Sequence, residues 1–178
     1  MTGGITTKAV ADAVRTVQGL PLEHQDALVD RIYAAQPHIL LTVLALSRDG
    51  VPEDMLGHAL HLLMVIHVCV ASQCPDGLPQ ASRDDIRRAM ERHLAMLGYL
   101  SKEPDLKMWR LTCESYPEPV LLAYVVNYLL ERGIWAETDD QYRVSSMAKV
   151  ELDLYVDAYR AWRGREAGGE ARPSEAAT

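Results

Sequence analysis

The chain has 178 residues, of which 48% are hydrophobic and 24% are charged, and these values are typical of one soluble globular domain. Its formal net charge is -7 at pH 7, and its basic residues gather into no tail or stripe, so the composition argues against a nucleic-acid-binding protein. Phenylalanine is absent, so the core must consist of Leu, Val, Ile, Ala and Met, which favours helices over sheets.

Apolar residues recur every three to four positions along most of the chain, which predicts amphipathic helices. The predicted helices lie near residues 9–17, 22–33, 37–46, 52–73, 82–97, 119–133 and 147–163. The segment 52–73 is apolar around most of its circumference, so we expect it to be the central helix. The predicted fold class is therefore mainly α, a single-domain bundle of six to seven helices around residues 52–73.

The predicted helix 82–97 has a clear apolar face. Its apolar residues at helical spacing are Ile86, Ala89, Met90, Leu94 and Leu97. We expect this face to pack against the rest of the bundle.

Two stretches, 99–112 and 134–145, break the helical pattern. Each follows a glycine at a helix end and has short apolar pieces on both sides of an acidic turn. They predict one or two short β-hairpins, with ordinary loops as the alternative. Residues 164–178 are rich in Gly, Ala, Glu and Pro, so we expect a disordered tail after a helical domain that spans residues 1–163.

The predicted location is the cytoplasm. The chain has an odd number of cysteines, Cys69, Cys74 and Cys113, without the paired spacing of a metal site, which is typical of a reducing compartment. The N-terminal segment lacks the pattern of a secretory signal, and no run reaches the roughly 18 apolar residues of a membrane helix. We therefore expect no membrane association and interpret Cys69 and Cys74 as ordinary buried residues.

One group of residues could bind a metal. Asp54, His58 and His61 have spacings that put them on one helical face, and a carboxylate with two imidazoles suits a transition metal such as zinc. A further ligand, for which His38, His93 and Cys69 are candidates, cannot be assigned from the sequence. In the alternative interpretation Asp54 favours the helix start, and the histidines form local hydrogen bonds at the edge of a packed helix. His67 is interpreted as a core histidine.

A second alternative is a DNA-binding regulator. The helix 82–97 contains four arginines, at positions Arg83, Arg87, Arg88 and Arg92. Because a possible hairpin follows it, the segment looks superficially like the end of a winged helix-turn-helix. Only one helix fits before Gly98, however, where that motif needs two, and neighbouring acidic residues offset the arginines.

The preferred interpretation is a non-enzymatic intracellular module that binds another protein, as an adaptor, regulator or neutralising partner would. No catalytic or cofactor-binding motif is recognised, so catalytic residues and cofactors are both predicted as none. The last helix carries residue types that are enriched at interfaces: Tyr155, Tyr159, Arg160, Trp162 and Arg163. They predict binding of another protein or a homodimer, with packing onto the bundle as the alternative.

Overall fold

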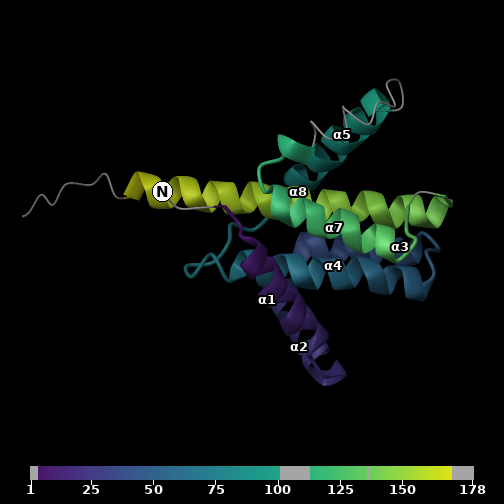
Figure 1. Ribbon diagram of the computed structural model, residues 1–178, viewed down its shortest axis with the longest axis horizontal. Coiled ribbons are helices and arrows are strands. Elements are labelled where there is room, and N and C mark those ends of the chain that lie inside the picture. Colours follow the sequence, from purple (N-terminus) through teal and green to yellow (C-terminus); the bar gives the residue numbers. More distant parts are fainter. Residues whose placement is uncertain (1–3, 101–112, 136, 170–178) are drawn as a thin grey trace, which may run out of the picture.

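The computed structural model describes residues 4–100, 113–135 and 137–169. Within these ranges the chain forms seven α-helices and no β-strand (Figure 1). The helices are α1 (Thr7–Gln18), α2 (Leu22–Ala35), α3 (Pro37–Arg48), α4 (Glu53–Ala71), α5 (Arg83–Leu100), α7 (Pro119–Glu131) and α8 (Asp139–Gly169). The predicted mainly α bundle is confirmed.

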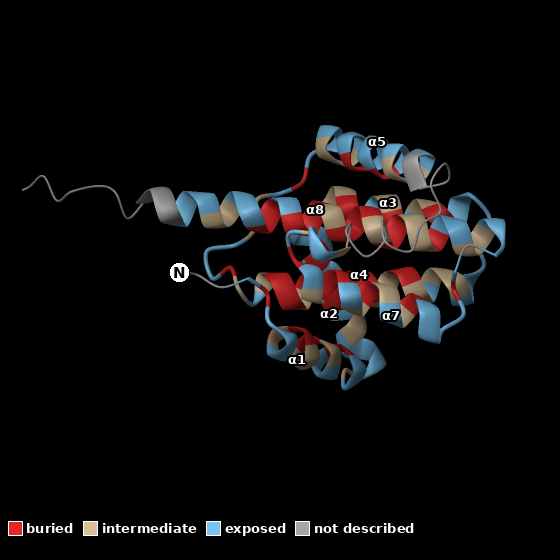
Figure 2. Cartoon of the chain, turned by 45° about the horizontal axis from the view of Figure 1, so that its top comes forward, coloured by how far each residue is buried: buried red, intermediate tan, exposed pale blue. Residues whose placement is uncertain are grey.

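Helix α4 is the centre of the bundle, as the sequence predicts. It packs most extensively against α8 and also contacts α1, α2 and α3. Every residue from Leu62 to His67 is buried, as are Cys69 and Val70. A helix that is apolar on nearly all sides must be covered on nearly all sides, and four other helices provide that cover (Figure 2).

Helix α4 is also long and apolar enough to cross a membrane, but half of the relevant window is buried inside the protein. The core helix of a soluble protein passes the same test of length and composition. The fold is therefore compatible with a soluble protein.

Helix α8 is longer than predicted, and this corrects the proposed hairpin at 134–145. The helix begins at Asp139, so the second half of that stretch is helical. The Thr138 hydroxyl accepts a hydrogen bond from the Gln141 backbone N–H at 3.3 Å, while the Gln141 side chain accepts one from the Glu137 N–H at 2.9 Å. This capping arrangement, with Asp139 and Asp140 in the first turn, favours a helix start.

The other boundary predictions fall partly outside the described residues. Tyr99 and Leu100 belong to α5 instead of a strand, and residues 101–112 of the predicted hairpin lie outside the described part of the chain. At the C-terminal end α8 continues through Gly169, beyond the predicted start of the tail at residue 164, and residues 170–178 are not described. Figure 1 shows this end of α8 extending past the bundle.

Gln36 joins distant parts of the chain. It lies between α2 and α3, and its side chain is 1% exposed. Its amide Nε2 donates a hydrogen bond to the Pro79 carbonyl, and its Oε1 accepts one from the Ala81 N–H, each at 2.8 Å. One side chain thereby fixes the connection between α4 and α5.

Replacing Gln36 with alanine should lower the free energy of unfolding by about 2 kcal/mol, because a buried N–H and a carbonyl would both lose their partner. Urea denaturation monitored by circular dichroism measures this. The control is Asp76→Ala, at an exposed residue of the same connection, where we expect a change within about 0.5 kcal/mol. Equal effects of the two substitutions would contradict the role of Gln36.

Candidate functional site

Helix α5 buries few of its described side chains. It lies against α8 and, over a smaller area, α3. Among its described side chains only Ala89 and His93 are buried, and Arg92 adds an exposed ion pair with Asp157 at 2.6 Å. Figure 2 shows the helix as largely exposed on the outside of the bundle. A cavity and an open hollow lie next to each other beside α5, and both are lined by His93, Tyr142 and Ser146.

The cavity lies between α5, α7 and α8 and has a volume of about 230 Å³. Apolar side chains from all three parts line it, including Met96 and Leu97 from α5, Val125 and Leu129 from α7, and Trp135 from the segment before α8. Concave, mostly apolar cavities with a few polar groups are typical of small-molecule sites.

Three polar side chains at the cavity satisfy one another. The Tyr116 hydroxyl donates a hydrogen bond to Asp153 Oδ1 at 2.7 Å, and Lys149 Nζ donates to the same oxygen at 2.6 Å. The Lys149 ammonium also lies 4.8 Å from the centre of the Tyr116 ring. Burial and the neighbouring carboxylate raise the pKa of Tyr116, which therefore stays a hydrogen-bond donor.

His93 differs from these residues because its polar atoms have no partner among the described residues. The side chain is 7% exposed and borders both the cavity and the hollow. Neither ring nitrogen makes a hydrogen bond within the described part of the chain. Burial lowers the pKa of His93, and the nearby Lys149 ammonium lowers it further. The neutral ring has one donor and one acceptor, and buried polar groups normally have partners.

The prediction that the whole apolar face of α5 packs against the bundle is wrong, because part of this face borders the open hollow. The hollow has a volume of about 390 Å³, and Met90 and Leu94 line it together with Tyr142 at the start of α8. Leu94 is 60% exposed, Tyr142 41% and Met90 37%, whereas of the five predicted face residues only Ala89 is buried. The contact of α5 with α8 runs along the Ala89 and His93 line, so much of the predicted apolar face remains uncovered.

The predicted metal residues are used for contacts between α4 and α7. His58 Nδ1 lies 2.9 Å from the Tyr128 hydroxyl, and His61 stacks on the Tyr128 ring with centroids 4.9 Å apart. His61 Nε2 also lies 3.4 Å from the Tyr124 hydroxyl. Burial lowers the pKa of both histidines, with a smaller contribution from Arg132.

The three predicted ligands do not converge on one point. Asp54 acts on His58 only through its charge, which partly offsets the lowering of the histidine pKa. Among the described residues there is no group of three or more His, Cys, Asp or Glu side chains that could hold a metal ion. The structure therefore shows the two histidines in the hydrogen-bonded arrangement of the alternative interpretation.

The predicted interface residues of the last helix lie mostly inside the protein. Tyr155 is fully buried, and its hydroxyl lies 3.0 Å from Nδ1 of His67 on α4. Burial lowers the pKa of His67 to about 4, so it is a neutral core histidine, as the sequence predicts. Tyr159 is also buried and stacks on the half-buried Trp162, with centroids 6.1 Å apart.

The two arginines of this set have different surroundings. Arg163 lies over the Tyr159 ring and 4.0 Å from the buried carboxylate of Glu118, which also accepts a hydrogen bond from the Ile5 N–H at 2.7 Å. Arg160 is exposed. Packing within the chain thus accounts for both tyrosines, and the predicted set is not one exposed patch.

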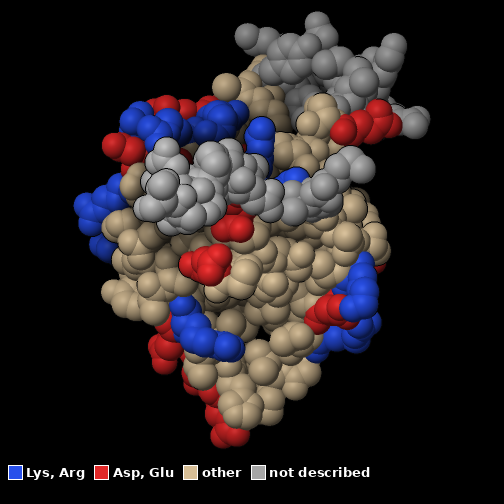
Figure 3. Space-filling model, turned by 90° about the vertical axis from the view of Figure 1, so that its left-hand side faces the viewer, with Lys and Arg blue, Asp and Glu red and all other residues tan. Residues whose placement is uncertain are grey.

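Three of the four arginines of α5, Arg87, Arg88 and Arg92, pair with acidic side chains. Arg87 lies 3.0 Å from Glu91 and 3.5 Å from Asp84, while Arg88 lies 2.5 Å from Asp85. At the end of the molecule shown in Figure 3, basic and acidic side chains lie beside one another instead of separating by sign. Paired arginines have less capacity to replace the counterions of a nucleic acid.

Cys69 and Cys74 are buried cysteines. Burial raises the pKa of Cys69 to about 12 and that of Cys74 to about 11, so neither is a reactive thiolate at neutral pH.

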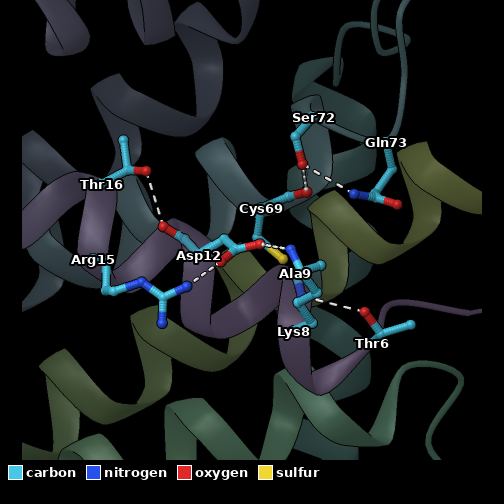
Figure 4. A network of polar contacts seen from close by, with 9 residues as sticks. All are labelled: Thr6, Lys8, Ala9, Asp12, Arg15, Thr16, Cys69, Ser72 and Gln73. Carbon is cyan, nitrogen blue, oxygen red and sulfur yellow. Dashed lines mark hydrogen bonds and ion pairs between the residues drawn. The ribbon is translucent and has the colours of Figure 1, made fainter.

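The polar side chains on the surface of α1 make local contacts. Figure 4 shows the polar contacts of α1 and the end of α4, where Thr6 caps α1 and Asp12 pairs with Lys8 and Arg15. These groups satisfy one another locally.

Glu151 of α8 is a second buried ionisable residue without a hydrogen-bond partner among the described residues. It is 1% exposed, and burial raises its pKa well above the ordinary value. The sequence did not indicate Glu151, and it indicated His93 only as one possible further metal ligand. The only sequence signal of their burial was a position on the buried side of a helix, since His93 is one turn after Ala89.

Comparisons with protein-family models, curated proteins and solved structures gave no match.

Glu151→Gln should remove a pH-dependent loss of stability. Above the ordinary pKa of 4.5 the unfolded chain releases the Glu151 proton while the folded chain keeps it, so wild-type stability falls as pH rises toward the raised folded pKa. Glutamine does not ionise. The stability of the variant relative to wild type should therefore increase by about 1.4 kcal/mol per pH unit in that window.

Urea denaturation of both proteins between pH 4.5 and 8 tests this, and His67 cancels because both proteins contain it. The control is Glu166→Gln, an exposed position on the same helix, which should show no such trend. A difference between wild type and Glu151→Gln that stays constant with pH would contradict the neutral state of the buried acid.

Proposed function

We propose that this protein is a non-enzymatic intracellular module that binds the apolar face of an amphipathic helix from a partner protein. The hollow beside α5 is the binding surface. The observation that carries the proposal is one concave surface around which Met90 and Leu94 of α5 and Tyr142 of α8 are exposed. Concave apolar surfaces bordered by polar residues are typical of protein interaction sites.

The shape and chemistry of the hollow favour a helix as the occupant. Met90 and Leu94 are four residues apart on α5, so they form a ridge along the helix. Met147 and Val150 of α8 line the other side. A groove between two helices accepts the apolar side chains of a third helix at spacings of three and four residues.

Charge favours a partner with basic residues beside its apolar face. The chain has a net charge of -7, which attracts basic proteins and speeds their association. Asp49 and Arg143 both line the hollow, and Arg143 donates a hydrogen bond to the Asp49 backbone carbonyl at 2.7 Å. A cytoplasmic location is part of this proposal and agrees with the free cysteines.

The test uses a displayed library of amphipathic helical peptides with basic flanking residues, selected on the wild-type protein. Leu94→Glu should weaken the selected peptides by about ten- to a hundredfold, because burial of one leucine contributes about 1.5–3 kcal/mol. Fluorescence anisotropy measures the dissociation constants. Leu22→Glu is the control, because Leu22 is 76% exposed on α2, away from the hollow.

Binding that survives Leu94→Glu, or that Leu22→Glu weakens equally, would contradict the proposed surface. Light scattering tests a different occupant. If the wild-type chain forms dimers that Leu94→Glu separates, a second copy fills the hollow and the proposal of a separate partner is wrong.

A further inference from the structure

We propose that the contact between α4 and α7 is a pH-sensitive switch, in which protonation of His58 and His61 releases the end of α7 from α4. The switch lies apart from the proposed interaction surface, because the hollow beside α5 is lined by residues of α5 and α8 and by the end of α3. Three features carry the proposal: the way in which α7 is attached to α4, the grouping of side chains around the Tyr128 ring, and the position of Arg132.

Helix α7 is attached to α4 differently from its other neighbours. Its most extensive backbone contacts are with α1 and α8, and its buried residues Leu121, Leu122, Val125 and Leu129 belong to the core. The contacts with α4 are instead made by histidine and tyrosine side chains that reach from one helix to the other. A contact of this kind can open without removing the whole of α7 from the bundle.

Two histidines and one arginine surround a single tyrosine ring. His61 stacks on the Tyr128 ring, and the His58 ring meets the same ring edge-on, with centroids 5.8 Å apart. The guanidinium of Arg132 lies 5.5 Å from the centre of this ring. Near neutral pH the arginine is the charged member of the group. Acidification would place three cations around one ring.

The closed arrangement opposes protonation of both histidines. Burial is the largest cause that lowers the pKa of His58 and His61 below the ordinary 6.5, and Arg132 lowers both further. At His61 the neighbouring His58 adds to this effect. A protonated imidazole on a tyrosine ring gains a cation–π attraction, but the pKa direction at both residues shows that the opposing effects are larger.

Two carboxylates lie near this group, and neither reverses the effect. Asp54 acts on His58, where it only partly offsets burial and Arg132. Glu131, next to Arg132 in the chain, acts on Tyr124. Because an opened form exposes the histidines to water, it binds protons more readily than the closed form. The closed contact is therefore fully favoured above pH 6.5 and loses stability as the pH falls toward the lowered pKa of the histidines.

Hydrogen exchange of the full chain, measured by mass spectrometry at about pH 7.5 and about pH 5 and corrected for the intrinsic exchange rate at each pH, tests the switch. Protection of residues 119–131 should fall by about threefold or more at the lower pH relative to protection of α3, because protonation favours the open form. In the double variant His58→Gln, His61→Gln this relative loss should disappear, since glutamine does not ionise. The control His24→Gln, at an exposed position on α2, should behave like the wild type.

Arg132→Gln provides a second test that leaves both histidines in place. Without the guanidinium the pKa of each histidine should lie closer to the ordinary value, which NMR titration of the ring protons measures. Protonation should then open α7 less, so the pH-dependent loss of protection should be smaller than in the wild type. If the double variant does not fold, this comparison decides.

Three results would overturn the proposal. Equal loss of protection in α3 and α7 would show only global destabilisation, to which His67 in the α4–α8 core contributes. A wild-type α7 that stays protected at the lower pH would show that the contact does not open. A loss that persists undiminished in the double variant and in Arg132→Gln would show that other groups cause it.

Discussion

The packing of α4 against α8 is the constraint on which the other helices depend. Both helices are buried over long stretches, and α1, α2, α3, α5 and α7 each cover part of this pair. A chain without phenylalanine must fill such an interface with aliphatic side chains, which contact several neighbours each. Removing either helix would expose the apolar surface of the other. The remaining helices would then lose the core against which they pack.

The buried polar groups of α4 and α8 differ in whether they have a hydrogen-bond partner. His67 and Tyr155 pair with each other across it, so their burial leaves that contact satisfied. Glu151 lies on the same helix as Tyr155, without a partner among the described residues, and burial keeps it neutral. The raised pKa of Glu151 and the lowered pKa of His67 oppose each other in their effect on stability. The folded state thus disfavours ionisation of both residues, which narrows the pH range of greatest stability.

Helix α5 contrasts with the α4–α8 pair. Its side toward α8 presents a small alanine and an unpartnered histidine, and its apolar ridge faces outward. Unfilled space beside the helix and few buried side chains are the features of a low-stability region of a fold. Such regions are where binding sites commonly occur, because a ligand can provide the contacts that the chain itself leaves unmade.

The helical class and the central position of residues 52–73 could be predicted from the sequence, because a repeat of three to four residues is a local property of the chain. The sequence also contains the capping residues Thr138 and Gln141. From the sequence, the acidic residues between them are interpreted as a hairpin turn instead of the first turn of a helix. Which side of each helix faces the core depends on tertiary packing. Tyr155 faces His67, His58 and His61 face tyrosines of α7, and Leu94 faces solvent. Rotation depends on which neighbour covers a face, and residues far apart in the chain provide that neighbour.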